Sequence, residues 1–514
     1  MLTQIKAAKC IGTQAVVVTV ETDIDHGIGI HLVGLADAAV KESLLRTVTA
    51  METLGFRVPG KKIVINLAPA DLRKNGSGYD LPIAVGIMAS SGKYSFVHAE
   101  EYLMMGELGL DGSVRPIEGA LPYVELAVAS GMRGAILPAE SAIEAAEITE
   151  IPVYGISSLK EALDILQGND CSHLLAGEIA GAFAASERTT AGESPVDFSD
   201  IIGQEAAKRA VEIAAAGGHN IIMIGAPGSG KSSLAKAMAG ILPPMTRKES
   251  LETSRIYSVA GLRKGCSGLI RQRPFRSPHY SASMAAIIGG GAGDNIVPGE
   301  VTLADNGVLF LDEMPQMPKS VLESLRGPIE DRKVTISRLK NKVEFPSSFT
   351  LVAAANPCPC GYYGEGDRCR CTVSQRTAYM SKLSGPIMDR IDLQVWMHPV
   401  PTEAVTRRDK AESSREVARR VCSARSRQAV RFKGEGISTN AEMSNRQTEK
   451  YCPLDEECRQ TLERIMKSTG MSLRAWFRII KVARTIADLE GEERIRPGHI
   501  MEASGYRLLD RGKI

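Results

Sequence analysis

The residues with the clearest chemical meaning form a glycine-rich stretch that ends in lysine and serine. Residues 225–232 fit the pattern G-x-x-x-x-G-K-S, in which backbone N–H groups curl around phosphate oxygens. The apolar run 220–224 reads as a buried strand, and 233–238 reads as a helix whose positive dipole end faces the phosphates. We expect a nucleotide to contact Gly225, Ala226, Pro227, Gly228, Ser229, Gly230, Lys231, Ser232 and Ser233, with Lys231 on the β- and γ-phosphates and Ser232 on Mg²⁺.

Two further apolar runs end in polar side chains that suit the same chemistry. After 308–311, Asp312 would help to hold Mg²⁺, and Glu313 would orient or deprotonate the attacking water. After 351–355 comes Asn356, a residue type that helps to position this water in ATPases of this class. Solvated strand-end acids, and an asparagine that caps a turn, are the alternatives. Together the motifs predict an enzyme that hydrolyses ATP with Mg²⁺.

Two arginines are candidates for contact with the γ-phosphate. Arg390 has the setting of an arginine finger, a cation supplied by a neighbouring subunit. Its alternative role is a salt bridge to Asp389 or Asp392. Arg474 opens a helix in the C-terminal region and is a candidate second arginine on the same phosphate. If Arg390 acts in trans, the active enzyme must be a ring, because only a closed assembly satisfies every site.

Hydrophobic patterning indicates which elements position these residues. After about residue 200 the chain shows strand–loop–helix units, which are typical of a parallel sheet covered by helices. Before that point, short β-like runs such as 15–21 alternate with helical ones such as 36–54. From about residue 402 the chain is helical and strongly charged. The expected fold class is therefore α/β with a helical C-terminal region.

Length and composition bound the architecture. A chain of 514 residues suggests two to four domains at about 150 residues each. A net charge of only +2 excludes attraction to nucleic acid by a whole-chain field. The N-terminus lacks a signal-peptide layout and no run of 18 apolar residues occurs, so we expect a cytoplasmic protein without a membrane partner. The predicted divisions are 1–170, a linker at 171–200, a core at 201–400 and a helical lid at 401–514.

Four of the ten cysteines are concentrated in one short segment of the core, 358–371. They form two C-x-C pairs in a glycine-rich loop, a pattern that suits a tetrahedral Zn²⁺ site of structural type. An Fe–S cluster and four ordinary thiols are the alternatives. The proposed ligands are Cys358, Cys360, Cys369 and Cys371.

Two basic stretches could contact a polyanion. Residues 255–276 contain six basic residues and no acid, and 333–345 reads as a β-hairpin with a basic tip. In a ring, such tips would stack phosphate-binding cations along a channel, with weak sequence preference and strong salt dependence. Solvated basic faces are the alternative. The proposed DNA contacts are Arg271, Arg273, Arg338, Lys340 and Lys342.

A set of segments along the chain carries a resemblance to a known family: 198–204, 225–232, 273–279, 289–291, 298–300, 306–314 and 384–393. They resemble the magnesium-chelatase-like AAA+ proteins, and within them the ComM/YifB family, and the similarity covers nearly the whole chain. This resemblance implies a hexameric ring related to helicases, with a P-loop AAA+ core, that promotes branch migration of DNA during natural transformation.

The N-terminal region resembles the proteolytic domain of Lon, through residues 106–117 and 135–138. Lon uses a Ser–Lys dyad, but the matching positions here fall near Asp80 and Pro122, neither of which can do that chemistry. A shifted nucleophile at Ser77 is the alternative. We expect a pseudo-protease scaffold that helps to assemble the ring or bind DNA.

Three other functions compete with a DNA motor. A metal-chelatase motor subunit shares the ATPase core, but such motors usually lack a Lon-like front domain. An ATP-dependent protease is disfavoured by the missing dyad. A remodeler of protein complexes stays open.

Overall fold

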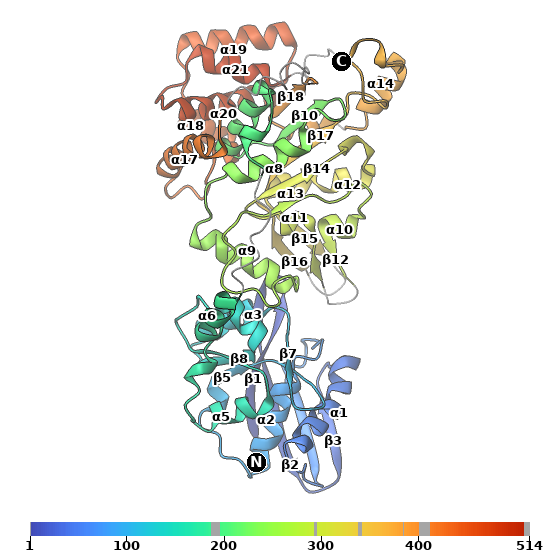
Figure 1. The fold of residues 1–514 in the computed structure, drawn as a ribbon, viewed down its shortest axis with the longest axis vertical. Coiled ribbons are helices and arrows are strands. Elements are labelled where there is room, and N and C mark those ends of the chain that lie inside the picture. The colour runs from blue at the N-terminus through green and yellow to red at the C-terminus, as the bar shows by residue number, and fades with distance from the viewer. Residues whose placement is uncertain are drawn as a thin grey trace.

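The computed structural model describes residues 2–186, 196–291, 296–337, 342–383, 385–399 and 412–507. Within these ranges the chain forms an N-terminal module at one end of a long axis, with a central core and a helical lid at the other (Figure 1). The expected α/β class is confirmed, because sheets and helices alternate through the first two parts and helices alone follow.

The N-terminal module is built on a mixed seven-stranded sheet in the order β3-β4-β2-β1-β5-β8-β9. Its first strands are antiparallel neighbours, with Thr3 opposite Thr22, whereas β5, β8 and β9 run parallel. The strands are β1 (Thr3–Ile11), β2 (Gln14–Asp25), β3 (Gly29–Val33), β4 (Lys62–Ala68), β5 (Tyr102–Met104), β8 (Gly134–Pro138) and β9 (Val153–Ile156), with a separate pair β6 (Glu107–Leu108) and β7 (Val114–Arg115).

Helices cover this sheet and form one apolar core with it. The most enclosed is α2, in which nearly every residue is buried, so that it reads as hydrophobic all round. The helices are α1 (Ala38–Thr53), α2 (Asp80–Ser90), α3 (Ala120–Ala129), α4 (Ala139–Ala142), α5 (Leu159–Leu166) and α6 (Ala176–Ser186), with a short 3₁₀ turn η2 (Ile143–Ala145). Within the predicted linker, α6 lies against η2 and β9, while residues 187–195 are outside the described ranges.

The core is a five-stranded parallel sheet in the order β11-β14-β17-β10-β18. Successive residues of β10 point to opposite faces: Ile221 and Met223 pack in one apolar cluster, Ile222 and Ile224 in another. Both faces are therefore covered, as expected for a parallel sheet. The strands are β10 (Ile221–Gly225), β11 (Phe275–Arg276), β14 (Val308–Leu311), β17 (Thr350–Ala355) and β18 (Leu393–Met397).

The remaining elements of the core surround this sheet and add two small antiparallel ribbons. The helices are α7 (Glu205–Gly217), α8 (Lys231–Ile241), α9 (Arg247–Val259), α10 (Met284–Ile288), α11 (Glu300–Leu303), α12 (Lys319–Ser324), α13 (Arg326–Asp331), α14 (Val373–Met380) and α15 (Gly385–Met388). The ribbons are β12 (Gly289–Gly290) with β13 (Val297–Pro298), and β15 (Lys333–Ser337) with β16 (Lys342–Pro346).

The lid is wholly helical in its described part and packs against one face of the core sheet. Ile479 and Ile486 of α20 share an apolar cluster with α7, α8 and the sheet. Helix α17 begins at a capping box, in which Ser413 and Glu416 each bind the other's backbone N–H. The helices are α17 (Ser414–Arg431), α18 (Asn445–Tyr451), α19 (Glu456–Thr469), α20 (Leu473–Glu490) and α21 (Pro497–Gly505). Among all described helices, none is long and apolar enough to cross a bilayer.

Candidate active site

The phosphate loop lies where the motif requires it, between the end of β10 and the start of α8. Gly228 and Gly230 have φ of 77° and 91°, a region that glycine adopts without steric strain. The loop can therefore turn its backbone N–H groups inward at the first turn of α8. This geometry fits a nucleotide phosphate.

Lys231 is buried in this loop and faces its carbonyls. Its Nζ donates to the carbonyl oxygens of Gly225 at 2.7 Å and Ala226 at 2.9 Å. Burial lowers the pKa of Lys231, whereas the charges of Asp312 and Glu313 oppose this shift. A buried cation is costly unless an anion compensates it. The site is thus suited to a phosphate group.

The two acids after β14 lie beside the loop. Ser232 Oγ donates to Asp312 Oδ2 at 3.1 Å, so the hydroxyl and carboxylate expected at Mg²⁺ are adjacent. The other oxygen of Asp312 accepts from the backbone N–H of Glu313 at 2.8 Å. Glu313 has a φ of 48°, a left-handed conformation that costs a non-glycine residue on the order of 1 kcal/mol and is found often at functional sites.

Asn356 joins this group because β17 lies between β14 and β10 in the sheet. Its Oδ1 is 3.4 Å from Nζ of Lys231. Gln204 is a contact that motif reasoning missed, since its side chain donates to the carbonyl of Ser229 at 3.2 Å. It stands in segment 198–204, which the sequence analysis used only for its resemblance.

The two candidate arginines lie near the amino-terminal ends of the core strands, whereas the phosphate loop lies at their carboxyl-terminal ends. Arg390 precedes β18, and its carbonyl accepts from the side chain of Asn220, which precedes the parallel neighbour β10. Between Ile221 and Gly225, β10 rises about 13 Å at about 3.3 Å per residue. That separation exceeds the length of an arginine side chain, so Arg390 does not reach the loop of its own chain.

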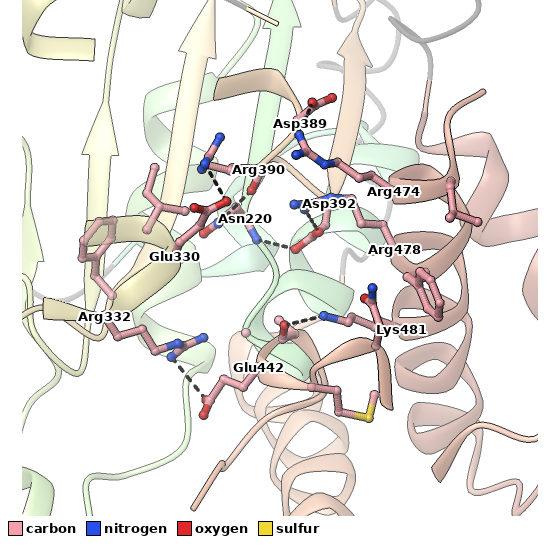
Figure 2. Close-up of a pocket in the computed structure, with 18 residues that line it drawn as sticks. Asn220, Glu330, Arg332, Asp389, Arg390, Asp392, Glu442, Arg474, Arg478 and Lys481 are labelled. Atoms are coloured by element: carbon pink, nitrogen blue, oxygen red, sulfur yellow. Dashed lines mark hydrogen bonds and ion pairs between the residues drawn. The ribbon is translucent and has the colours of Figure 1, made fainter. Parts of the chain in front are cut away.

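Arg390 and Arg474 both line a cavity of about 450 Å³ between the core and the lid (Figure 2). Arg390 is paired with Glu330 at 2.5 Å rather than with either aspartate considered from the sequence. Arg474 is paired with Asp389 at 3.0 Å, and its side chain is 73% exposed. The two cations thus line one cavity, although the Arg390 side chain is only 10% exposed.

Arg478 is another of the five cationic residues that line this cavity, and the sequence analysis missed it. It stands four residues after Arg474 on α20, a spacing that places both on one helix face. Arg478 pairs with Asp392, which also lies 3.3 Å from the ring nitrogen of His219. Burial opposes ionisation of Asp392, yet Arg478 and His219 hold the pKa of its carboxyl well below the usual range. This network fastens the lid to the core.

The four cysteines proposed as metal ligands lie together in the structure. Their sulfur atoms are all within 4.8 Å of one another. Cys358 Sγ is 3.3 Å from Cys360 Sγ and 3.8 Å from Cys369 Sγ. Cys358 is fully buried, whereas the others are partly or well exposed.

Much of the acid-free basic stretch contacts the N-terminal module. Arg255 of α9 binds both carboxylate oxygens of Glu125 on α3 at 2.7 Å. Arg271 pairs with Glu147 at 2.5 Å, although its side chain is still 68% exposed. The acids that pair with Arg255, Lys264 and Arg271 therefore come from more than 100 residues earlier in the chain, where local charge counting does not find them.

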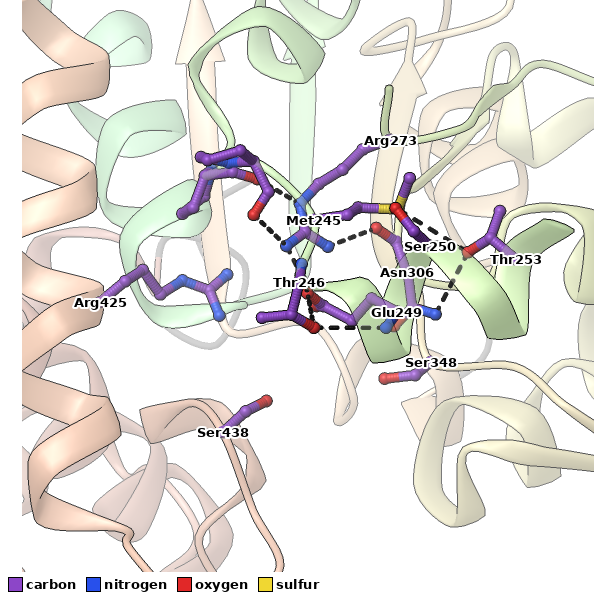
Figure 3. A network of polar contacts seen from close by, with 12 residues as sticks. Met245, Thr246, Glu249, Ser250, Thr253, Arg273, Asn306, Ser348, Arg425 and Ser438 are labelled. Carbon is purple, nitrogen blue, oxygen red and sulfur yellow. Dashed lines mark hydrogen bonds and ion pairs between the residues drawn. The ribbon is translucent and has the colours of Figure 1, made fainter. Parts of the chain in front are cut away.

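Arg273 is held inside the core by four groups. Its guanidinium donates to the carbonyls of Pro243 at 2.6 Å and Asn306 at 2.7 Å, and it pairs with Glu249 at 3.0 Å (Figure 3). A weaker contact reaches the carbonyl of Pro244 at 3.5 Å. With these donors engaged, Arg273 is better suited to positioning α9 than to binding DNA.

The predicted hairpin is present as β15 and β16, with Val334 opposite Phe345. Lys342 is exposed and pairs with Glu344 at 3.2 Å. The predicted tip contacts Arg338 and Lys340 lie outside the described residues. One side of β16 meets the N-terminal module: a Cβ placed on Gly12, in the β1–β2 turn, would lie 2.8 Å from Val343.

The positions matched to the Lon dyad have other partners. Asp80 accepts from Arg46 and from the backbone N–H of Leu108, both at 3.1 Å. Pro122 is buried in α3. The Ser77 hydroxyl binds the carboxylate of Glu107 instead of a lysine.

Comparison with known families covers most of the chain. A family profile described as magnesium chelatase, subunit ChlI, matches residues 197–405, and its C-terminal counterpart matches 411–507. A third profile, subunit ChlI of Mg-chelatase, matches residues 20–141. The N-terminal module thus carries the chelatase name too, so its presence does not by itself separate a chelatase motor from a DNA motor.

Individual relatives match over nearly the full length. The uncharacterized protein YifB of Salmonella typhimurium is 41% identical over 504 residues, 98% of this chain and 96% of the relative. The competence protein ComM of Haemophilus influenzae is 40% identical over 503 residues, with the same coverage. An archaeal Lon protease of Halobacterium salinarum is 51% identical over only 57 residues, 11% of this chain and 8% of the relative.

Proposed function

The chain belongs to the family of YifB and ComM, AAA+ ATPases of the magnesium-chelatase-like group, and from that premise we propose that it is a cytoplasmic, ATP-driven DNA motor. In this proposal six copies form a ring that binds single-stranded or branched DNA and promotes branch migration. The number six comes from the resemblance to hexameric ring helicases. The printed name of the Haemophilus relative, a competence protein, favours DNA as the substrate.

The observation that carries the proposal is the position of Arg390 and Arg474. Both lie near the ends of the core strands that are opposite their own phosphate loop, and both line the cavity between core and lid. A neighbouring copy that presents its loop to this surface would receive both cations. Repeating this head-to-tail relation generates a ring when the rotation closes.

The chemistry assigned to each residue follows from its contacts. Lys231 and the loop N–H groups would bind the phosphates, and Ser232 and Asp312 would hold Mg²⁺, which would supply neutralisation of the phosphate charge. Glu313 takes the proton of the attacking water, and Asn356 keeps that water in line. Arg390 and Arg474 stabilise charge on the neighbour's γ-phosphate.

The side-chain contacts of the described residues favour some of the proposed DNA contacts over others. Lys342 is exposed at the start of β16, while the proposed contacts Arg338 and Lys340 lie outside the described residues. Arg271 keeps an exposed side chain, whereas Arg273 is engaged internally and is left out. Contacts through lysine and arginine favour the phosphate backbone, so affinity should fall steeply with salt.

The decisive experiment measures ATP hydrolysis with no DNA and with single-stranded, duplex and branched DNA, alongside native mass with nucleotide. We expect stimulation by DNA and a mass of six chains. An ATP hydrolysis rate that no DNA changes, together with a native mass of one chain, would reject the DNA-motor proposal. Casein added in parallel tests the protease alternative, for which we expect no cleavage because Ser77 has a carboxylate partner in place of lysine.

A magnesium-chelatase-type motor subunit is the second candidate, favoured by the three ChlI profiles. Such a motor would act on a partner protein, as would a remodeler of protein complexes. ATP hydrolysis that responds to a partner subunit and not to DNA would support this class.

A further inference from the structure

We propose that Cys358, Cys360, Cys369 and Cys371 bind one structural Zn²⁺, and that this ion holds the phosphate loop and Asn356 in the arrangement that binds ATP. The inference rests on the proposed ATP site, and it gives that site a second, metal-dependent support. Three observations carry it: the spacing of the sulfurs, the build of the loop, and the contacts of the loop with the nucleotide site.

The sulfur spacing fits one tetrahedral ion. Zn–S bonds of about 2.3 Å place the corners of a tetrahedron about 3.8 Å apart. Three sulfur separations in the structure are 3.3, 3.8 and 3.7 Å, and all four atoms lie within 4.8 Å of one another. An Fe–S cluster has inorganic sulfur and several irons between its thiolates, which spreads them farther apart. The geometry therefore favours a single ion, and four thiolates in a closed tetrahedron favour zinc.

Within residues 358–371 only Cys358 and Gly361 are buried, so apolar packing contributes little to holding this loop. Gly361, Gly364 and Gly366 have φ of 85°, 91° and 59°, so the chain turns repeatedly through conformations that glycine permits. Of the four ligands only Cys358 is fully buried. A loop without its own apolar core depends on a staple, and binding free energy at a zinc site becomes folding free energy.

The loop lies directly against the nucleotide site. A Cβ placed on Gly361 would lie 2.8 Å from Cδ of Pro227 and 3.9 Å from the side chain of Asn356. Asn356 in turn lies 3.4 Å from Nζ of Lys231. Gly364 packs on Trp396 of β18. The cysteine loop, residues 358–371, thus contacts the phosphate loop at Pro227, while strand β10 leads directly into the phosphate loop.

The same segment also continues toward the neighbouring site. After Cys371 the chain forms α14, whose Tyr379 is buried, and then reaches Arg390. The loop therefore joins Asn356, which serves the chain's own ATP, to the arginine proposed for the next subunit. Loss of the ion would loosen both ends of this segment.

The test compares Cys369→Ser with Cys266→Ser. Cys369 is a partly exposed ligand, so its replacement leaves no core cavity, and Cys266 is an exposed cysteine outside the cluster. Full-length proteins are purified without chelator, and metal per chain is measured with the affinity for a fluorescent ATP analogue plus Mg²⁺. We expect one Zn²⁺ per chain in wild type and in Cys266→Ser. Cys369→Ser should lose it and bind the analogue about tenfold more weakly, about 1.4 kcal/mol.

A second variant isolates the brace from the ion. Gly361→Ala should keep its zinc, because all four thiols stay, yet bind nucleotide more weakly through the clash with Pro227 and the strain of a Cβ at a φ of 85°. Wild-type protein without zinc overturns the site, and zinc-free Cys369→Ser with wild-type affinity overturns the coupling. Neither measurement involves DNA, so a failure of the DNA-motor proposal leaves this result intact.

Discussion

At the scale of single residues, side chains of the same charge that lie close in the sequence have different surroundings. Asp312 accepts a hydrogen bond from Ser232. Glu313, the next residue, has a left-handed backbone conformation and is the proposed base for the attacking water. Lys231 is buried among carbonyls, and Lys236, five residues on in α8, is exposed. These differences allow matched variants within one short region.

Lys231→Ala should abolish tight nucleotide binding, because it removes the buried cation that faces the phosphates. Glu313→Gln should bind ATP normally but hydrolyse it about 10²- to 10⁴-fold more slowly, since the amide cannot accept the water's proton. Equilibrium binding and steady-state hydrolysis distinguish the two. Lys236→Ala is the control, and it should behave as wild type. Normal turnover by Glu313→Gln would reject the assigned base.

Mixtures of inactive variants test the placement of the arginines. Arg390→Ala mixed with Lys231→Ala should recover some ATP hydrolysis, because some interfaces then join an intact loop to an intact arginine. Arg390→Ala mixed with Arg474→Ala should recover nothing, since both arginines serve the same loop from the same surface. Recovery in the second mixture, or none in the first at any ratio, would contradict that arrangement.

At the scale of elements, the junction between α3 and α9 explains what the basic stretch does. Arg255 binds Glu125 across it, and Glu144 of η2 is buried there, only 2% exposed. Burial raises the pKa of Glu144 to about 7, although Ser258 and Arg263 act in the opposite direction. The junction therefore contains a carboxyl that prefers to be neutral.

Folding stability should carry the signature of Glu144. Its contribution is fully present below about pH 4.5, its ordinary pKa, and is lost as pH rises to about 7. The loss amounts to at most about 3 kcal/mol. Glu144→Gln mimics the neutral acid, so its melting temperature should fall less than that of wild type between pH 5 and pH 8. Glu147→Gln, at a half-exposed ion pair, is the control that should keep the wild-type slope.

Local motifs predicted much of this organisation, and contacts between distant segments account for the rest. The phosphate loop, the strand-end acids and the cysteine cluster are each encoded within a few residues, so spacing sufficed to find them. Arg273 was assigned to DNA because its charge is visible in sequence, while the carbonyls of Pro243 and Asn306 that bind it are not. Arg478 belongs to no motif, although its four-residue spacing from Arg474 was readable.

At the scale of the whole molecule, the hairpin of β15 and β16 lies where the core meets the N-terminal module (Figure 1). Its described part offers Lys342 to solvent, and its strands bury Val334 and Phe345 in the core. A ring of such hairpins would present cations to a shared axis.

Salt dependence of DNA binding tests this surface. Each phosphate contact contributes close to one unit to the slope of log affinity against log salt. Lys342→Ala should therefore weaken binding to all sequences alike and flatten the slope. Lys160→Ala, an exposed lysine on α5, should change neither. An unchanged slope for Lys342→Ala would remove this residue from the DNA surface.

The contact between Gly12 and Val343 connects the hairpin of β15 and β16 to the sheet of the N-terminal module. β1 is the fourth of seven strands, so the turn that follows it transmits force to the middle of a stiff slab and not to a loose border. Any stroke of the hairpin would press on that slab, and any load on the slab would resist the stroke. A protein that binds the N-terminal module would then slow the motor without contacting its ATP site.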